Sequence, residues 1–193
     1  MKQKLAKYIS IAGHPLATIS AFVIIVMFTF EEFYKALLIT FLIVGCIIIP
    51  ITIRNYIKTK KGEYTNFDVS IRTQRHSMYL FAMPLMLMIT IVLFYTGQSR
   101  NLCFGVLFGF LLLLISFIVN FYIKCSGHVS LTIYLSFLII PLNFIFGIII
   151  LLFSGLIGWS RVELKRHTIK EVCAGAIIGF TIGFFMLLVE GVL

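Results

Sequence analysis

Long apolar segments separated by short charged stretches restrict the fold of this chain more than any other feature. Of its 193 residues, 61% are hydrophobic and only 12% are charged, whereas soluble domains are about half apolar and a quarter charged. About 20 apolar residues in a helix cross a bilayer core, where a helix satisfies its own backbone hydrogen bonds. The sequence therefore predicts an all-α, polytopic transmembrane helical bundle of six to seven spans, forming a single domain over residues 1–193.

The spans are expected at the apolar segments, with the polar stretches as connections. Five of them are expected at about 8–30, 36–53, 78–96, 102–123 and 172–189. The lysines ahead of the first segment are similar to the start of a secretory signal peptide. However, His14-Pro15 interrupts the segment and no small-residue cleavage site follows, so we expect a retained first helix.

Residues 129–158 decide the topology. This apolar run is long for one span and short for two at about 1.5 Å rise per residue. Pro141 and Asn143 lie near its middle and favour a hairpin turn. A hairpin brings the polar stretches 54–77, 124–128 and 160–171 to one side of the membrane, whereas a single helix separates the last from the other two. We predict the hairpin, because it gathers the polar chemistry in one place.

The net charge of +9 comes from basic residues that flank the apolar segments. In this setting basic residues indicate membrane topology, anionic lipid or a phosphate site, and we expect no nucleic-acid partner. With the hairpin, 14 of the 16 Lys and Arg lie on the shared side and only Lys35 and Arg100 lie across. The positive-inside rule then predicts a bacterial inner (cytoplasmic) membrane protein whose site faces the cytoplasm.

Three polar clusters fall on the shared side: 68–76, 124–128 and 160–171. They supply several cations, a Ser-Gly turn at the start of a helix, and histidines. Arginine forks match phosphate oxygens, and free N–H groups at a helix start favour an anion. His167 and Glu171 are four residues apart and would share a face of a helix, so the carboxylate can orient the imidazole. The residues indicate a site for a phosphorylated ligand, with a histidine suited to accept a phosphoryl group and a second suited to protonate the leaving group.

This pattern resembles the phosphatidic acid phosphatase type 2 superfamily, which includes membrane lipid phosphatases and vanadium haloperoxidases. Its third motif, Ser-Arg-x5-His-x3-Asp, is matched by Ser160-Arg161-x5-His167-x3-Glu171, with Glu in place of Asp. Its second, Pro-Ser-Gly-His, is matched by Ser126-Gly127-His128 after Cys125. Its first, Lys-x6-Arg-Pro, has no counterpart. Instead, Arg72-x-x-Arg75 resembles a divergent bacterial branch in which an Arg-x-x-Arg pair replaces that motif.

The resemblance implies roles for the matched residues. His167 would be the nucleophile that forms a phosphohistidine, Glu171 would orient it, and His128 would protonate the departing lipid alcohol. The expected phosphate-binding residues are Arg161, Ser126, Gly127, Arg72, Arg75 and Lys124, of which Lys124 is added from its position alone. His14 and His76 belong to no motif and are expected at the membrane interface.

The resemblance further implies a metal-independent enzyme without a cofactor. Its substrate would be a lipid phosphomonoester or pyrophosphate of the phosphatidic acid, phosphatidylglycerol phosphate or polyprenyl pyrophosphate class. The scarcity of carboxylates near the expected site, among cations that repel Mg²⁺, also argues against a metal site. A catalytically silent lipid-phosphate binding protein, or a small transporter, is the alternative. Gly175, Gly179 and Gly183 predict close packing of the last span within the bundle.

Overall fold

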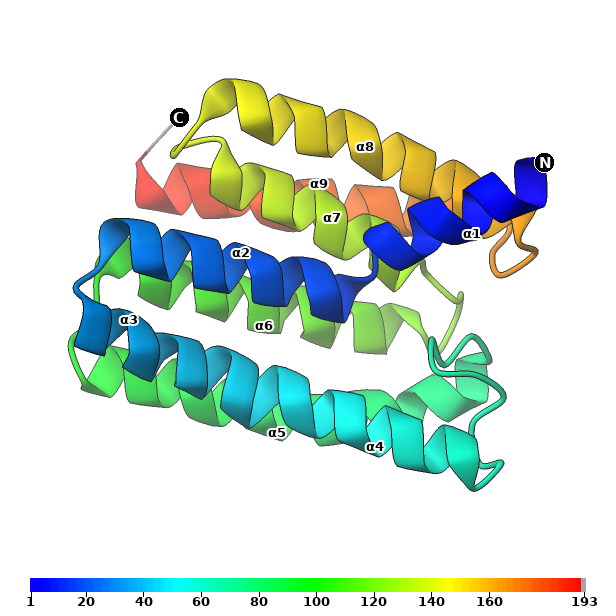
Figure 1. Ribbon diagram of the computed structural model, residues 1–193, viewed down its shortest axis with the longest axis horizontal. Helices are drawn as coiled ribbons and strands as arrows, with labels where there is room; N and C mark the ends of the chain where they lie inside the picture. The colour runs from blue at the N-terminus through cyan, green and yellow to red at the C-terminus, as the bar shows by residue number, and fades with distance from the viewer. Residues whose placement is uncertain (192–193) are drawn as a thin grey trace.

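The computed structural model describes residues 1–191, which form a helical bundle (Figure 1). No strand occurs in this part of the chain. In chain order the helices are α1 Lys2–Ala12, α2 Pro15–Phe30, α3 Phe33–Thr40, the π-helix η1 Phe41–Ile48, α4 Ile49–Lys60, α5 Arg72–Tyr95, α6 Arg100–Val119, α7 Gly127–Ile139, α8 Phe144–Glu163 and α9 Ile169–Glu190. They run roughly along the long axis of the molecule, so their connections gather at its two ends (Figure 1).

Five helical segments are long and apolar enough to cross a membrane. They are Phe33–Lys60 (α3, η1 and α4 together), α5, α6, α8 and α9. α1 and α2 make a sixth if they count as one span with a bend of 44°. α7 is apolar but has only 13 residues, fewer than a full crossing needs, and it packs within the bundle against α8 and α9 (Figure 1). The chain is an integral membrane protein, and the predicted all-α transmembrane bundle is confirmed.

The outer surface of the bundle is apolar along the long helices. Large exposed side chains include Phe41, Ile53, Ile91 and Leu152. Contiguous apolar surface of this kind is rare on soluble monomers, whereas lipid tails accept it. The exposure pattern therefore agrees with the span assignment.

The predicted hairpin is confirmed. α7 ends at Ile139 and α8 begins at Phe144, with Pro141 in the turn between them. Asn143 is the N-cap of α8, and its side-chain oxygen accepts a hydrogen bond from the Phe146 N–H at 2.9 Å. Such a cap satisfies a backbone donor that the helix itself leaves free. The hairpin returns the chain to the end of the bundle where α5 and α7 begin.

Three predicted boundaries are wrong by six residues or more, because apolar residues mark the bilayer core rather than the ends of the helices. The first helix, α1, begins at Lys2 rather than at about residue 8. The second span continues as α4 to Lys60, beyond the expected end at residue 53. The third begins as α5 at Arg72 rather than at Met78. Charged side chains are stable on a helix once it leaves the hydrocarbon. As a result, Arg72 and Arg75 lie on the first turn of α5 instead of in a loop.

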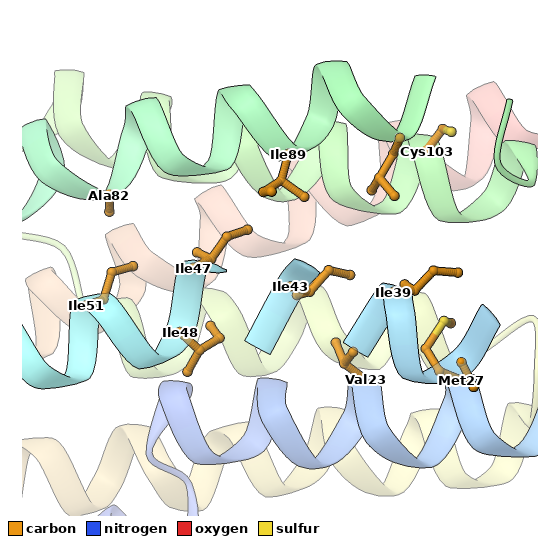
Figure 2. Packing of buried hydrophobic residues seen from close by; sticks show 12 residues of the cluster. Val23, Met27, Ile39, Ile43, Ile47, Ile48, Ile51, Ala82, Ile89 and Cys103 are labelled. Atoms are coloured by element: carbon orange, nitrogen blue, oxygen red, sulfur yellow. The ribbon is translucent and has the colours of Figure 1, made fainter. Parts of the chain in front are cut away.

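The first half of the chain packs around an apolar cluster. Figure 2 shows Val23 and Met27 of α2 near Ile39 of α3 and Ile43 of η1, with Ile89 of α5 across from them. A second cluster lies among α6, α7, α8 and α9. The two clusters build two halves of the bundle, and the cavity described below lies between them.

The glycines of α9 pack directly against α7, as predicted. A Cβ on Gly175 would lie 2.6 Å from the backbone oxygen of Ser126, and one on Gly179 would lie 2.5 Å from that of Ser130. These distances are shorter than any real Cβ contact, so α7 and α9 approach as closely as they do only because these positions lack a side chain. This close approach positions the start of α7, which carries Ser126 and His128, against the start of α9.

We expect Gly179→Ala to destabilise the protein, since its methyl group would press on backbone that cannot move without separating α7 from α9. Overpacking of this kind costs roughly 1–3 kcal/mol, measurable as a lower thermal unfolding temperature in detergent. Gly155→Ala in α8 is the matched control, because no described atom lies within 4 Å of its added Cβ. Equal unfolding temperatures for the two variants would contradict the packing described.

Candidate functional site

The predicted polar segments meet at one end of the bundle. Four structural elements contribute: the last turn of α8 with the loop after it, the start of α5, the start of α7, and the bend between α1 and α2. Backbone and side-chain hydrogen bonds join them. The Ser126 N–H donates to the Glu171 carbonyl at 3.0 Å, and the Lys124 ammonium donates to the Arg166 carbonyl at 2.9 Å. Residues as far apart in the sequence as Ser10 and Arg161, whose side chains are hydrogen-bonded, share this polar cluster.

His167 and Glu171 contact each other, but the reason differs from the one expected. Nδ1 of His167 lies 2.9 Å from Oε2 of Glu171. His167 precedes α9 instead of lying on it, because Thr168 is the N-cap. Glu171 closes a capping box with Thr168: its carboxylate accepts the Thr168 N–H at 3.2 Å, and its own N–H donates to the Thr168 hydroxyl at 3.3 Å. The glutamate side chain is long enough to serve both the cap and the histidine.

The other ring nitrogen of His167 faces a cation. Nε2 lies 3.2 Å from Nη2 of Arg75. Since Glu171 accepts from Nδ1–H, we assign the lone pair to Nε2, where it accepts from the guanidinium. Burial, followed by the charges of Arg75 and Lys124, lowers the pKa of His167 to about 2. The imidazole is thus neutral at physiological pH, with a fixed tautomer and with the lone pair of Nε2 directed at the Arg75 guanidinium.

Arg75 connects three of the converging segments. Its Nε donates to the Val69 carbonyl at 2.9 Å, its Nη1 to the Cys125 carbonyl at 2.5 Å, and its Nη2 to His167. The side chain is buried. Fixed in this way, the guanidinium holds its charge beside His167 without rearrangement.

Arg161, in the last turn of α8, has no exposed surface. Its Nη1 donates to the Ser10 hydroxyl at 2.7 Å and to Oδ2 of Asp68 at 2.8 Å. Its Nε and Nη2 find no partner within residues 1–191. A buried guanidinium with free N–H groups is costly, and an anion with several oxygens is the ligand that satisfies it best.

The start of α7 offers further groups to such an anion. The hydroxyl of Ser126 and Nε2 of His128 are buried and have no partner in the described chain. α7 begins at Gly127, and the first N–H groups of a helix have no intrahelical acceptor. A helix start with free donors is suited to an anion.

The two remaining predicted residues differ in position. The ammonium of Lys124 lies 3.2 Å from Oε2 of Glu171, so it belongs to the pocket. Arg72 lies outside it: its exposed guanidinium donates to the carbonyls of Phe121 and Tyr122, at 3.3 and 2.9 Å. Arg72 therefore supports the segment after α6, and Arg75 is the member of the Arg-x-x-Arg pair that reaches His167.

Sequence reasoning missed Ser10, His14 and Asp68 as members of the site. Ser10 contacts Arg161, and His14 Nε2 lies 3.4 Å from Oδ1 of Asp68. The rings of His14 and His128 meet edge to face, with centroids 5.1 Å apart. For His14 the available signal was the pair His14-Pro15, which interrupts an otherwise apolar segment. His76, by contrast, packs against Phe117 and Phe121.

His14, Asp68 and His128 also offer one metal-ligand atom each, all within 4.8 Å of one another. Two imidazoles and a carboxylate suit a transition metal. However, Arg161 already binds the Asp68 carboxylate, and the charge of Arg75 is close to His128. These guanidinium groups disfavour a divalent cation at the three ligand atoms.

An apolar cavity of about 490 Å³ extends from the polar cluster between α2, η1, α5, α6 and α7. At the cluster it is lined by His14, Asp68, Arg75 and His128. Its other end is lined by Phe30 and Asn101, which belong to the opposite end of the bundle. A hydrocarbon chain fits such a space, with a polar head group held at the cluster.

No protein-family model, curated protein or solved structure matches this chain. What the site does must therefore be inferred from its own geometry and chemistry.

The lowered pKa of His167 makes stability depend on pH. An unfolded histidine titrates near 6.5, so below that pH the unfolded chain binds a proton that the folded site excludes. Unfolding therefore becomes easier as the pH falls from 6.5, by up to about 1.4 kcal/mol per pH unit for this group. We expect the unfolding temperature in detergent to drop more steeply between pH 6.5 and 5 for the wild type than for His167→Gln. Parallel curves would show that His167 is not buried as a neutral group.

Proposed function

We propose that this protein is a membrane lipid phosphatase that works through a phosphohistidine intermediate and does not require a metal. One observation carries the proposal: Glu171 orients the neutral imidazole of His167 so that Nε2 faces Arg75, and Arg75 lines one end of an apolar cavity. A nucleophile, cations for phosphate and a space for hydrocarbon meet at one point. The resemblance of motifs 160–171 and 126–128 to the phosphatidic acid phosphatase type 2 superfamily supports the same reaction.

Phosphate binding comes first. The free Nε and Nη2 of Arg161, the guanidinium of Arg75, the Ser126 hydroxyl and the Gly127 N–H supply the donors for the non-bridging oxygens. The phosphate takes over the Arg75 Nη2–H that Nε2 of His167 accepts, which frees the lone pair for attack while the hydrogen bonds to Val69 and Cys125 keep the guanidinium in place. Donors fixed before the reaction stabilise the charge that develops on the oxygens in the transition state.

The chemical steps then follow. Nε2 of His167 attacks phosphorus, and the bond from phosphorus to the lipid alcohol oxygen breaks as protonated His128 gives that oxygen a proton. Glu171 balances the positive charge on the phosphorylated imidazole. In the second step water attacks phosphorus, His128 takes a proton from that water, and the nitrogen–phosphorus bond breaks. Inorganic phosphate leaves, and both histidines regain their initial states.

The apolar cavity supports an amphiphile as substrate, and we propose that its head is a phosphomonoester or pyrophosphate. We place the site on the cytoplasmic side of a bacterial inner membrane, because 14 of the 16 Lys and Arg fall on its side of the predicted topology. A cytoplasmic site favours phosphatidic acid or phosphatidylglycerol phosphate. A polyprenyl pyrophosphate fits the opposite orientation.

His167→Ala tests the reaction. We expect phosphate release from phosphatidic acid in detergent to fall by on the order of 10⁶-fold, as when the nucleophile of a catalytic unit is removed. EDTA should leave the wild-type rate unchanged, and vanadate should inhibit it. His76→Ala, which removes a histidine that packs against Phe117 and Phe121, is the control and should retain activity.

Three outcomes would contradict the proposal. Activity that persists in His167→Ala would show that His167 is not the nucleophile. Loss of activity with EDTA would indicate metal catalysis. Binding of phosphatidic acid without hydrolysis by the wild type would indicate a lipid-phosphate binding protein, and movement of the lipid without hydrolysis would indicate a transporter.

A variant that fills the cavity tests the hydrocarbon site. Gly109 lines the cavity beside Met86 and Tyr134, so Gly109→Leu puts a side chain where the lipid chain is expected. The KM for long-chain phosphatidic acid should rise about tenfold, equivalent to about 1.4 kcal/mol, while p-nitrophenyl phosphate is cleaved as before. Gly155→Leu adds the same side chain at an exposed position of α8 and should change neither. An equal effect of Gly109→Leu on both substrates would place the hydrocarbon elsewhere.

A further inference from the structure

His14 lies outside every motif, yet it reaches the centre of the site. It is the N-cap residue of α2, directly before Pro15, in the bend between α1 and α2. Its ring lies between Phe67, at 5.4 Å, and His128, at 5.1 Å. The helix that carries it begins 112 residues before α7. Only the folded bundle brings the two histidines together.

Asp68 links His14 to the phosphate pocket. One carboxylate oxygen accepts a hydrogen bond from Arg161, and the other lies 3.4 Å from Nε2 of His14. Burial by itself would raise the pKa of Asp68, but the hydrogen bond from His14 and the charges of His128 and Arg161 outweigh it and hold the pKa well below its usual range. Asp68 is therefore ionised, and its two partners fix the direction of the carboxylate.

His128 needs this negative charge if it is to act as an acid. It is buried, with 6% of its surface exposed, and this burial, together with the charges of Arg161, His14 and Arg75, lowers the pKa of its ring. Among the groups that act on it, Asp68 is the one that favours the protonated form. The other carboxylate of the site, Glu171, is already engaged by His167 and Lys124.

We infer that His14 is a positioning residue for the general acid: it holds the Asp68 carboxylate on one side and packs against His128 on the other, so that His128 can carry the proton given to the leaving oxygen. This inference rests on the proposed phosphatase reaction. The assignment gives α1 and α2 a part in the chemistry. It also pairs each histidine of the reaction with its own carboxylate, Glu171 for His167 and Asp68 for His128.

The inference predicts an effect that depends on the leaving group. An alkoxide leaves poorly without a proton, whereas p-nitrophenolate is stable enough to leave without one. Benzyl phosphate and p-nitrophenyl phosphate are similar in size and lack a lipid tail, so their comparison separates proton donation from hydrocarbon binding. Loss of an acid catalyst costs about 10²–10⁴-fold, and loss of its support should cost part of this.

The experiment measures kcat for both substrates with the wild type, His14→Phe and His14→Gln. We expect His14→Phe to lower kcat for benzyl phosphate at least about tenfold and to change kcat for p-nitrophenyl phosphate less than threefold. His14→Gln, whose amide can still donate to Asp68, should recover part of the loss. His76→Gln, a histidine of the same end of the bundle that packs on Phe117 and Phe121, should match the wild type.

The controls keep the inference separate from the proposed function. Thermal unfolding identifies variants that are not folded. If His14→Phe is one of them, the comparison uses His14→Gln, for which we expect a smaller decrease in kcat for benzyl phosphate and no decrease for p-nitrophenyl phosphate. A folded variant that loses activity equally on both substrates, or on neither, overturns the role of His14 while the phosphatase reaction stands. A wild-type protein that hydrolyses no phosphate ester overturns the reaction and this inference together.

Discussion

The buried charge of Arg161 is the constraint on which the arrangement of the site depends. A guanidinium with no exposed surface at the end of a membrane helix is costly unless its charge is paired and its N–H groups are satisfied. Asp68 and Ser10 supply the pairing for one nitrogen, and in doing so they tie α1 and the loop before α5 to α8. Its other two nitrogens, Nε and Nη2, are buried without a partner in the described chain. In the proposed reaction these free N–H groups bind the phosphate.

The capping box at the start of α9 connects helix formation with chemistry. Thr168 and Glu171 would stabilise this helix start in any protein, but the same carboxylate also binds Nδ1 of His167. The histidine is held by the end of a rigid helix rather than by a flexible loop. Lys124 lies just before α7, and its ammonium contacts both the Glu171 carboxylate and the Arg166 carbonyl. These two contacts stabilise the loop between α8 and α9. A glutamate suits this position because it must reach both the cap and the imidazole.

Close packing of α7 and α9 relates the two histidines of the proposed reaction. Because the glycines of α9 have no side chain, the backbone of α7 can lie directly against α9. At the same place the Ser126 N–H donates a hydrogen bond to the Glu171 carbonyl. Because small residues control this approach, a feature of membrane helix packing also sets the separation between His128 and His167. The cavity that reaches the cluster lies on the other face of α7, so a substrate held there would have its head group at the start of that helix.

The sequence by itself determined the membrane bundle, the hairpin around Pro141 and Asn143, and most residues of the pocket, because hydropathy and the spacing of short motifs are local properties of the chain. It also pointed to the contact between His167 and Glu171, though through a shared helix face instead of a capping box. Tertiary structure alone decided that Arg75, and not Arg72, reaches His167, since this depends on where α5 begins and how it is rotated. It alone brought Ser10, His14 and Asp68 to the site. Their partners lie on helices far away in the chain, and no local pattern records such a contact.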